Sequence, residues 1–413
     1  MPGLTQKECD AITYLCSPTA IRERCQQVFT LACANQLQHF AYHPEKLHEV
    51  AAYVATITRQ TYPDLTIPYH SRWRHFHAGG VDRVAQLDQQ LGQCSRVEQA
   101  RCCFDLVITS VLLDAGAGAQ WRYHETSTGQ TYTRSEGLAV ASWHMFLTGL
   151  FSSRADHPWQ ADATGLQCLT EARLGEALQV TLDNPLVGLA GRATLLRALG
   201  AAVAQAPHYF GRSPRLGNLF DYLCTQATGG ILSAQQVLVA ILESLGPIWP
   251  GRLSIGRVNL GDVWRHNQVK GDEVTAGLVP FHKLSQWLTY SLIEPLQEAG
   301  IIVEDIEALT ALPEYRNGGL LLDLGVLTPR HEAVLGQVHT ADAEVVVEWR
   351  ALTVAVLDRV AAEVRSLLGL SAQHFPLAKV LEGGTWRAGR QVARERRADG
   401  TPPLRVVSDG TVF

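Results

Sequence analysis

Apolar residues recur three and four positions apart along most of the chain, which is the spacing of helices that bury one face. Pro18 divides the first such stretch into two helices, Ser233 is a typical N-cap, and Pro280 suits a first helical turn. We therefore predict a mainly α protein. Its helices are expected within residues 5–39, 45–59, 81–112, 135–150, 166–178, 191–206, 233–244, 280–299 and 341–369.

Strand signals are few and short. Residues 121–134 and 252–264 read as β-hairpins, the second turning near Gly256, and the tail 404–413 as a last short strand. The chain shows no βαβ alternation and no GxGxxG or GxxxxGK[ST] motif, so a doubly wound nucleotide-binding fold is not expected. We predict a single large helical domain over residues 1–413. Its parts would be an N-terminal helical part (1–80), a helical core (81–370) and a C-terminal extension (371–413).

The composition is that of a globular protein. The 413 residues are 46% hydrophobic and 18% charged, and a net charge of −5 gives no electrostatic reason to expect nucleic acid or an anionic membrane as partner. No signal peptide is evident, and no apolar run approaches the roughly 18 residues that span a bilayer. The nine cysteines form no CxxC pair and are expected to be reduced thiols. These features predict a cytoplasmic protein.

The stretch FHKLSQ (281–286) opens a predicted helix with polar side chains on one face. His282 and Gln286 are four residues apart, and Lys283 lies beside them. Donors gathered at a helix N-terminus suit hydroxyls, a carbonyl or a phosphate. The alternative is a solvated face with a hydrogen-bonded histidine.

The stretch EYRNGG (314–319) places Glu314, Tyr315 and Arg316 directly before a run of leucines. Pro313 disfavours helix at the preceding residue, so Glu314 is expected to begin a new element. A partly buried carboxylate needs a partner, and Arg316 or Lys283 would serve. Such a carboxylate can act as a base or stabilise a cation. The alternative is a surface ion pair.

Two further segments carry candidate side chains. Asp114 precedes a run of small residues, Trp121 offers a flat surface and Glu136 opens a helix; a core tryptophan and an ordinary helix start are the alternatives. Arg72 and Arg74 concentrate positive charge before a helix and predict phosphate binding.

The same segment carries His70, His75 and His77, but their spacing matches no common zinc motif. We therefore predict neither a metal nor a cofactor.

Over nearly its whole length the chain resembles the uracil-catabolism protein four family, long catalogued as a domain of unknown function. The resemblance rests on strings such as SVLLDAGAGAQWRY, TGQTYTRSEGLAVASWHMF, NPLVGLAGRA, LGPIWPGRL, EYRNGGLLLDLGVL, PLAKVLEGGTWRAGR and VSDGTVF. It implies a role in a pyrimidine-degradation pathway that passes through a ring-opened nucleoside or nucleotide and ends in urea.

A more distant similarity is to the queuosine-salvage N-glycosylase family. Its FYKRAQ, DYR and EIRA strings correspond, in the same order, to residues 281–286, to 314–316 and to Glu348-Trp349-Arg350-Ala351. The similarity implies a helical core related to DNA glycosylases, cleavage of a base from a ribose 5′-phosphate, and catalysis by the acid at Glu314. Here Glu replaces Asp, His282 replaces a tyrosine and Gly319 stands where that family has a glutamine.

Together the two resemblances predict an N-glycosidase that releases urea from a ring-opened uridine derivative, a ribosylurea or its 5′-phosphate. Glu314 would be the catalytic carboxylate and Lys283 its assistant. The predicted substrate-binding residues are Asp114, Trp121, Glu136, His282, Gln286, Tyr315, Arg316, Glu348 and Arg350, with Arg72 and Arg74 as phosphate ligands. The alternatives are an amidohydrolase acting on the opened ring, or a non-catalytic partner of the ring-opening enzyme.

Overall fold

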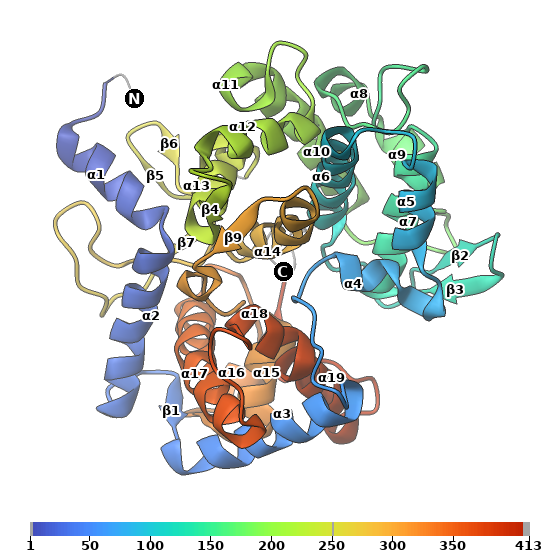
Figure 1. Ribbon diagram of the computed structural model, residues 1–413. Coiled ribbons are helices and arrows are strands. Elements are labelled where there is room, and N and C mark those ends of the chain that lie inside the picture. The colour runs from blue at the N-terminus through green and yellow to red at the C-terminus, as the bar shows by residue number, and fades with distance from the viewer. Residues whose placement is uncertain (1–2, 250–251, 408–413) are drawn as a thin grey trace. The chain divides into compact units, whose positions relative to one another are not determined.

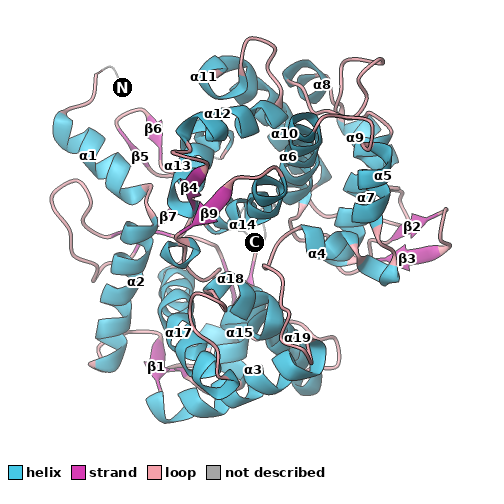
Figure 2. Cartoon of the chain, in the orientation of Figure 1, coloured by secondary structure: helices cyan, strands magenta, loops and turns pink. Residues whose placement is uncertain are grey.

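The chain is mainly helical, as predicted, in a computed structural model that describes residues 3–249 and 252–407 (Figures 1 and 2). Each described strand pairs with one other strand only. The antiparallel pairs are β1 (Phe40–Tyr42) with β10 (Leu327–Pro329), β2 (Tyr123–Glu125) with β3 (Gln130–Tyr132), β5 (Ser254–Ile255) with β6 (Val258–Asn259), and β7 (Val263–Arg265) with β8 (Leu278–Pro280). The parallel pairs are β4 (Ile231–Ser233) with β9 (Ile302–Glu304), and β11 (Val338–His339) with β12 (Arg405–Val406).

The described residues group into two compact units. The first takes residues 3–70, 252–286 and 305–407, and the second takes residues 71–249 and 287–304. Helix α14 (Lys283–Glu298) contributes its first turn to the first unit and its remainder to the second. The predicted part boundaries near residues 80 and 370, and the relation to DNA glycosylases, stay predictions.

In the first unit, helices α2 and α3 pack against α17, whose residues 345–357 are buried without a break. A helix that is buried on every side belongs in a core, and α17 fills that role here. The helices of this unit are α1 (Gln6–Leu15), α2 (Pro18–Cys33), α3 (Leu47–Thr61), α15 (Tyr315–Asp323), α16 (Ala333–Gly336), α17 (Glu344–Leu368), α18 (Leu377–Val380) and α19 (Trp386–Arg396), with a π-helical turn at Leu381–Thr385 and 3-10 turns at Pro44–Lys46 and Ile306–Ala308.

Helix α15 lies between α17 and α19 in Figure 1, and glycines set its close approach to both. A Cβ atom at Gly318 would overlap the indole ring of Trp349 on α17. On α19, a Cβ atom at Gly389 would overlap the main-chain carbonyl of Arg316. Side chains at these positions would push α15 away, so the two glycines fix where α15 begins and hence where Glu314 stands.

The second unit is built around α6, of which residues 102–113 are buried in full. Helices α7, α10 and α12 pack on it. The helices of this unit are α4 (Trp73–Phe76), α5 (Arg83–Gln90), α6 (Arg96–Leu113), α7 (Arg134–Leu147), α8 (Ala163–Gln167), α9 (Glu171–Ala177), α10 (Leu189–Gln205), α11 (Pro207–Phe210), α12 (Leu219–Gln226) and α13 (Ala234–Leu245), with 3-10 turns at Ala78–Gly80, Leu216–Asn218 and Gly246–Ile248.

Most of the predicted elements are confirmed, with four corrections. Pro18 starts α2, Ser233 caps α13 with a capping box, and both hairpins form, the second turning at Gly256 with φ 56°. The stretch 81–112 is two helices, and so is 166–178. Pro280 ends strand β8 instead of opening α14. The stretch 371–403, in which no helix was predicted, contains α18, the π-helical turn and α19. In the tail, β12 forms, and residues 408–413 lie outside the described residues.

Within the described ranges, none of the helices combines the length and the apolar character that crossing a membrane requires. All nine cysteines are free thiols, in agreement with the prediction.

Candidate active site

Glu314 is the N-cap of α15, and its carboxylate is held by the helix it starts. Oε1 accepts from the main-chain N–H of Asn317 at 2.6 Å, and Oε2 accepts from that of Arg316 at 2.9 Å. The side chain is half-buried. The predicted partnership of Glu314 with Arg316 is therefore made through the arginine main chain. Each carboxylate oxygen keeps a second lone pair that can face a ligand.

The side chain of Asn317 forms hydrogen bonds that hold the main chain around the N-cap residue Glu314. Its Nδ2 donates to the carbonyl of Leu312 at 3.0 Å, and its Oδ1 accepts from Thr385 Oγ1 at 2.9 Å. Asn317 and Thr385 are fully buried. Thr385 ends the π-helical turn, an irregularity that is frequent at functional sites. Glu314 thus sits on a main chain fixed from two directions.

Tyr315 and Arg316 occupy the first turn of α15 and are both half-buried. Nη1 of Arg316 donates to the carbonyl of Gly400 at 2.8 Å, which ties the start of α15 to the segment after α19. Their predicted contacts with substrate stay predictions.

The FHKLSQ stretch begins with a turn whose histidine is hydrogen-bonded to another segment of the chain. His282 has a φ of 46°, in the left-handed region, and its buried Nε2 donates to the carbonyl of Leu15 at 3.0 Å. Burial lowers the pKa of His282, although the charge of Asp262 partly opposes this. The histidine is hydrogen-bonded, as in the alternative stated for this stretch, but the face is not solvated, since His282 and Gln286 are buried. Their predicted contacts with substrate stay predictions.

Gln286 joins the start of α14 to the segment that leads to Glu314. Its Oε1 accepts from the main-chain N–H of Thr310 at 2.8 Å, and its Nε2 donates to Thr310 Oγ1 at 2.8 Å and to the carbonyl of Phe281 at 3.0 Å. Gln286 and Thr310 are fully buried. The FHKLSQ stretch is therefore bonded to Thr310, four residues before Glu314.

Asp262, which sequence reasoning missed, holds both Lys283 and Arg350. Arg350 donates from Nη1 and Nη2 to the two carboxylate oxygens at 2.8 Å each, and the main-chain N–H of Lys283 donates to Oδ2 at 2.9 Å. Trp264 Nε1 adds a third donor at 2.6 Å. Burial would raise the pKa of Asp262, but the charge and hydrogen bonds of Arg350 lower it below its ordinary value. Its only sequence signal was its place as the one acid within the predicted hairpin 252–264.

The side chain of Glu348 is hydrogen-bonded within the protein and supports the fold. The carboxylate is 1% exposed, and its Oε1 accepts from the main-chain N–H groups of His39 and Phe40 at 3.1 and 2.8 Å. These bonds fix the start of β1. The Glu-Trp-Arg-Ala string of the second resemblance thus supplies Glu348 and Arg350 as buried anchors, and a contact of either with substrate stays a prediction.

In the second unit, the structure brings Arg72 and Asp114 together. Nη1 of the fully buried Arg72 lies 3.2 Å from Oδ1 of Asp114. Burial lowers the pKa of Arg72, and the nearby charges of Asp114 and Glu136 oppose that effect. Arg74 pairs instead with Glu294, Nη2 to Oε1 at 2.6 Å. Both arginines that were predicted to bind phosphate therefore face a carboxylate.

Trp121 lies in the core, and Glu136 lies at a helix start. The indole of Trp121 is 0% exposed, and its Nε1 donates to the carbonyl of Leu178 at 2.9 Å. A Cβ atom at Gly137 would come within 2.9 Å of the ring. Glu136 is half-buried in the first turn of α7. These positions match the alternatives stated for both residues, and their predicted contacts with substrate stay predictions.

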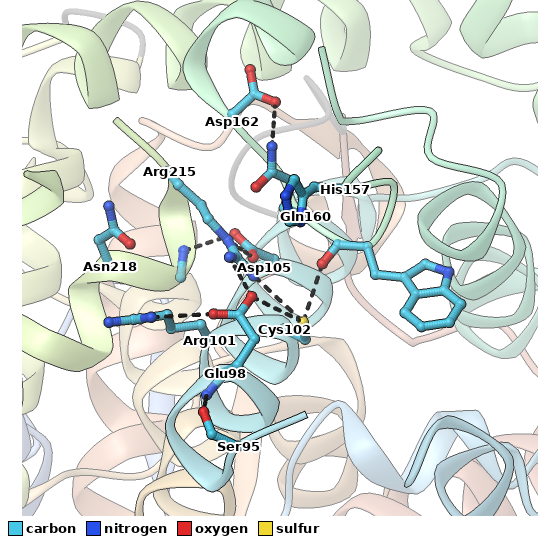
Figure 3. A network of polar contacts seen from close by, with 12 residues as sticks. Ser95, Glu98, Arg101, Cys102, Asp105, His157, Gln160, Asp162, Arg215 and Asn218 are labelled. Atoms are coloured by element: carbon cyan, nitrogen blue, oxygen red, sulfur yellow. Dashed lines mark hydrogen bonds and ion pairs between the residues drawn. The ribbon is translucent and has the colours of Figure 1, made fainter. Parts of the chain in front are cut away.

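A buried charge network on α6 also escaped sequence reasoning (Figure 3). Arg215 donates from Nη1 to Glu98 and from Nε to Asp105, each at 2.6 Å, and Asp105 also accepts from the main-chain N–H of Gly217 at 2.7 Å. Asp105 is fully buried. The sequence signal was a polar stripe at positions 98, 101, 102 and 105 of an apolar helix. Because its partners are protein groups, this network anchors the 215–217 segment to α6.

The buried ion pair of Arg83 and Glu125, also in the second unit, makes the stability of the protein depend on pH. Arg83 donates from Nε and Nη2 to the two oxygens of Glu125 at 2.9 and 2.5 Å, and Thr128 and His144 add bonds at 2.7 and 2.8 Å. Burial would raise the pKa of Glu125, but these hydrogen bonds lower it to about 2.

Glu125 therefore stabilises the fold fully above the ordinary glutamate value of about 4.3, and this stabilisation is lost as the pH falls toward 2. We expect the guanidinium chloride midpoint of the protein to fall over this window, and the fall to be shallower in Glu125→Gln. Glu49 is exposed, and in Glu49→Gln the midpoint should fall with pH as it does in the wild type. If the midpoint of Glu125→Gln also falls as in the wild type, other carboxylates govern acid unfolding.

In residues 3–249 and 252–407, no three His, Cys, Asp or Glu side chains are grouped so that they could hold a metal ion. Two of the three histidines of the 70–77 segment have separate acidic partners: His70 Nδ1 lies 2.9 Å from Glu382 Oε2, and His77 Nδ1 lies 3.6 Å from Asp82 Oδ1. The ring of His75 contacts Trp287 edge to face.

Comparison with known proteins places the chain among relatives that match it end to end. A family model described as "Protein of unknown function (DUF1688)" matches residues 14–413. The protein is 40% identical to "Protein urg3" of Schizosaccharomyces pombe over 415 residues, which cover 98% of this chain and 99% of that one. It is 36% identical to "Uracil catabolism protein 4" of Lachancea kluyveri, with 97% and 99% covered.

Proposed function

We propose that this chain, which belongs to the DUF1688 family, acts in uracil catabolism as an N-glycosidase that releases urea from a ring-opened uridine derivative. The pathway assignment follows the printed name of the Lachancea relative. The reaction would be hydrolysis: water adds to C1′ of the ribose, the bond from C1′ to the urea nitrogen breaks, and one proton passes from water to the departing urea.

The observation that carries the proposal is the placement of Glu314. A glycosidic bond breaks through a cation-like transition state at C1′, which a fixed carboxylate stabilises while it also accepts a proton from the attacking water. Main-chain N–H groups hold both oxygens of Glu314 in place, and Gln286 and Thr310 bond its segment to the start of α14. A carboxylate so fixed needs no reorganisation during the reaction.

Other residues of the first unit have supporting roles in this proposal. Lys283, at the first position of α14, would donate a proton or a hydrogen bond to the leaving urea. Arg316 and Tyr315, in the turn that Glu314 caps, would contact the ribose or its phosphate. Asp262 and Arg350 would act as positioning residues, because they hold the main chain of Lys283.

The test is direct. The purified full-length protein is incubated with synthetic ribosylurea and, separately, with its 5′-phosphate, and free urea and free ribose are measured over time. We expect equal amounts of both products from one of the two substrates. Release of ammonia or carbamate without ribose would point instead to an amidohydrolase. Absence of any turnover would support the non-catalytic alternative.

A further inference from the structure

Arg72 is held rigidly in the second unit by three of its nitrogen atoms. Its main-chain N–H donates to Ser291 Oγ at 2.9 Å, Nε donates to Ser110 Oγ at 2.7 Å, and Nη1 donates to the carbonyl of Ser135 at 3.3 Å. The fourth nitrogen, Nη2, is buried and has no hydrogen-bond partner within the part of the chain that the structure describes. A fixed guanidinium group therefore presents a single donor nitrogen that the protein leaves unused.

Asp114 supplies an acceptor beside it. Oδ1 forms an ion pair with Nη1 of Arg72 at 3.2 Å, but it is buried and accepts no well-directed hydrogen bond from the described residues. Arg192 fixes the main chain around Asp114, because its Nε donates to the carbonyl of Leu113 at 3.0 Å and its Nη2 to that of Ala115 at 2.8 Å. The next residues, AGAGA (115–119), carry only small side chains.

The charges at this place decide what could bind there. An anion such as phosphate would meet Arg72 but also the carboxylate of Asp114, with Glu136 close enough for its charge to act on Arg72. A cation would be repelled by Arg72. A neutral group that accepts one hydrogen bond and donates another would satisfy Nη2 and Oδ1 together. Buried polar atoms left without partners are unfavourable, so a ligand that bonds to both atoms would gain affinity from each.

We propose that Arg72 and Asp114 form a binding site for a neutral ligand with a carbamoyl group, a ureido group or a primary amide. The carbonyl oxygen of the ligand accepts from Arg72 Nη2, and its N–H donates to Asp114 Oδ1. This inference replaces the phosphate role predicted for Arg72. It concerns binding alone and uses only contacts in the second unit, so it stands or falls separately from the catalytic role of Glu314.

The first experiment needs no variant. Binding of N-methylurea, of tetramethylurea and of inorganic phosphate to the full-length protein is followed by ligand-observed NMR titration at millimolar concentrations, well below those that denature proteins. Tetramethylurea keeps the carbonyl group but has no N–H. We expect N-methylurea to bind at least about tenfold more tightly than tetramethylurea, since one charge-assisted hydrogen bond is lost. Binding of phosphate in place of N-methylurea, or equal binding of the two ureas, would overturn the proposal.

Variants then assign the contacts. Arg72→Lys and Asp114→Ala should each weaken N-methylurea binding at least about tenfold. The matched control is Arg101→Lys, which changes another arginine of this unit, paired with Asp221 on the surface, and should leave the affinity unchanged. Cooperative heat unfolding of each variant establishes that it is folded. If both site variants are folded and bind N-methylurea as tightly as the wild type does, the ligand binds elsewhere and the proposal is wrong.

Discussion

Replacing Glu314 with serine should abolish urea release while leaving the protein folded. Serine is among the best N-cap residues, so Glu314→Ser keeps an acceptor for the first N–H groups of α15 and removes only the carboxylate. The proposed roles of that carboxylate, stabilising the cation at C1′ and activating water, are each worth about 10²- to 10⁴-fold. We therefore expect kcat to fall by about a thousandfold or more, with a melting temperature close to that of the wild type.

A matched control separates capping from catalysis. Asp82 is also an acidic N-cap, of α5, and its carboxylate accepts from the main-chain N–H of Ala85 at 3.0 Å. Asp82→Ser makes the same chemical exchange in the second unit and should preserve turnover. If Glu314→Ser retains activity, the carboxylate is a cap and nothing more. If it loses activity only in proportion to a loss of folded protein, its role is likewise structural.

The helical class, both hairpins and the helix start at Glu314 could be predicted because each has a local cause. Apolar spacing, a glycine at the turn of the 252–264 hairpin and Pro313 before Glu314 act within a few residues of the structure they produce. The prediction that Pro280 lies in a first helical turn was wrong for a related reason. It is equally acceptable as the last residue of a short strand, and pairing of β8 with β7 decided the outcome.

The candidate site was harder to predict because its polar groups are assigned by contacts between distant residues. Arg350 and Asp262 are 88 positions apart, and Thr385 and Asn317 are 68 apart. Nothing near Asp262 in the sequence indicates that a buried arginine will neutralise it. The order of the FHKLSQ, EYR and EWRA strings directed attention to the segments that form the candidate site. It did not reveal that Gln286, Glu348 and Arg350 would be committed to protein partners.

Replacing Arg350 with methionine should cause one of the largest losses of stability available in this chain. Arg350 is 0% exposed, and it neutralises the carboxylate of Asp262, whose side chain is 16% exposed, with two hydrogen bonds. Removal of one partner from a buried ion pair costs about 3–5 kcal/mol, because the other charge is left in the core. Arg365→Met, on the same helix, breaks a more exposed pair with Glu307 and should cost about 1 kcal/mol or less. Denaturant unfolding at neutral pH measures both.

The pH dependence of this loss identifies its cause. Arg350 lowers the pKa of Asp262 in the folded protein, so the stabilisation by this pair is complete above the ordinary aspartate value of about 3.9 and is lost as the pH falls below it. The difference between the wild type and Arg350→Met should therefore be largest near neutral pH and shrink in acid. In a protein that already carries Asp262→Leu, Arg350→Met should lower the free energy of unfolding by less than it does in the wild type, because no carboxylate remains to be neutralised. A variant with wild-type stability but a raised KM would reverse this assignment, since Arg350 would then serve the substrate and not the fold.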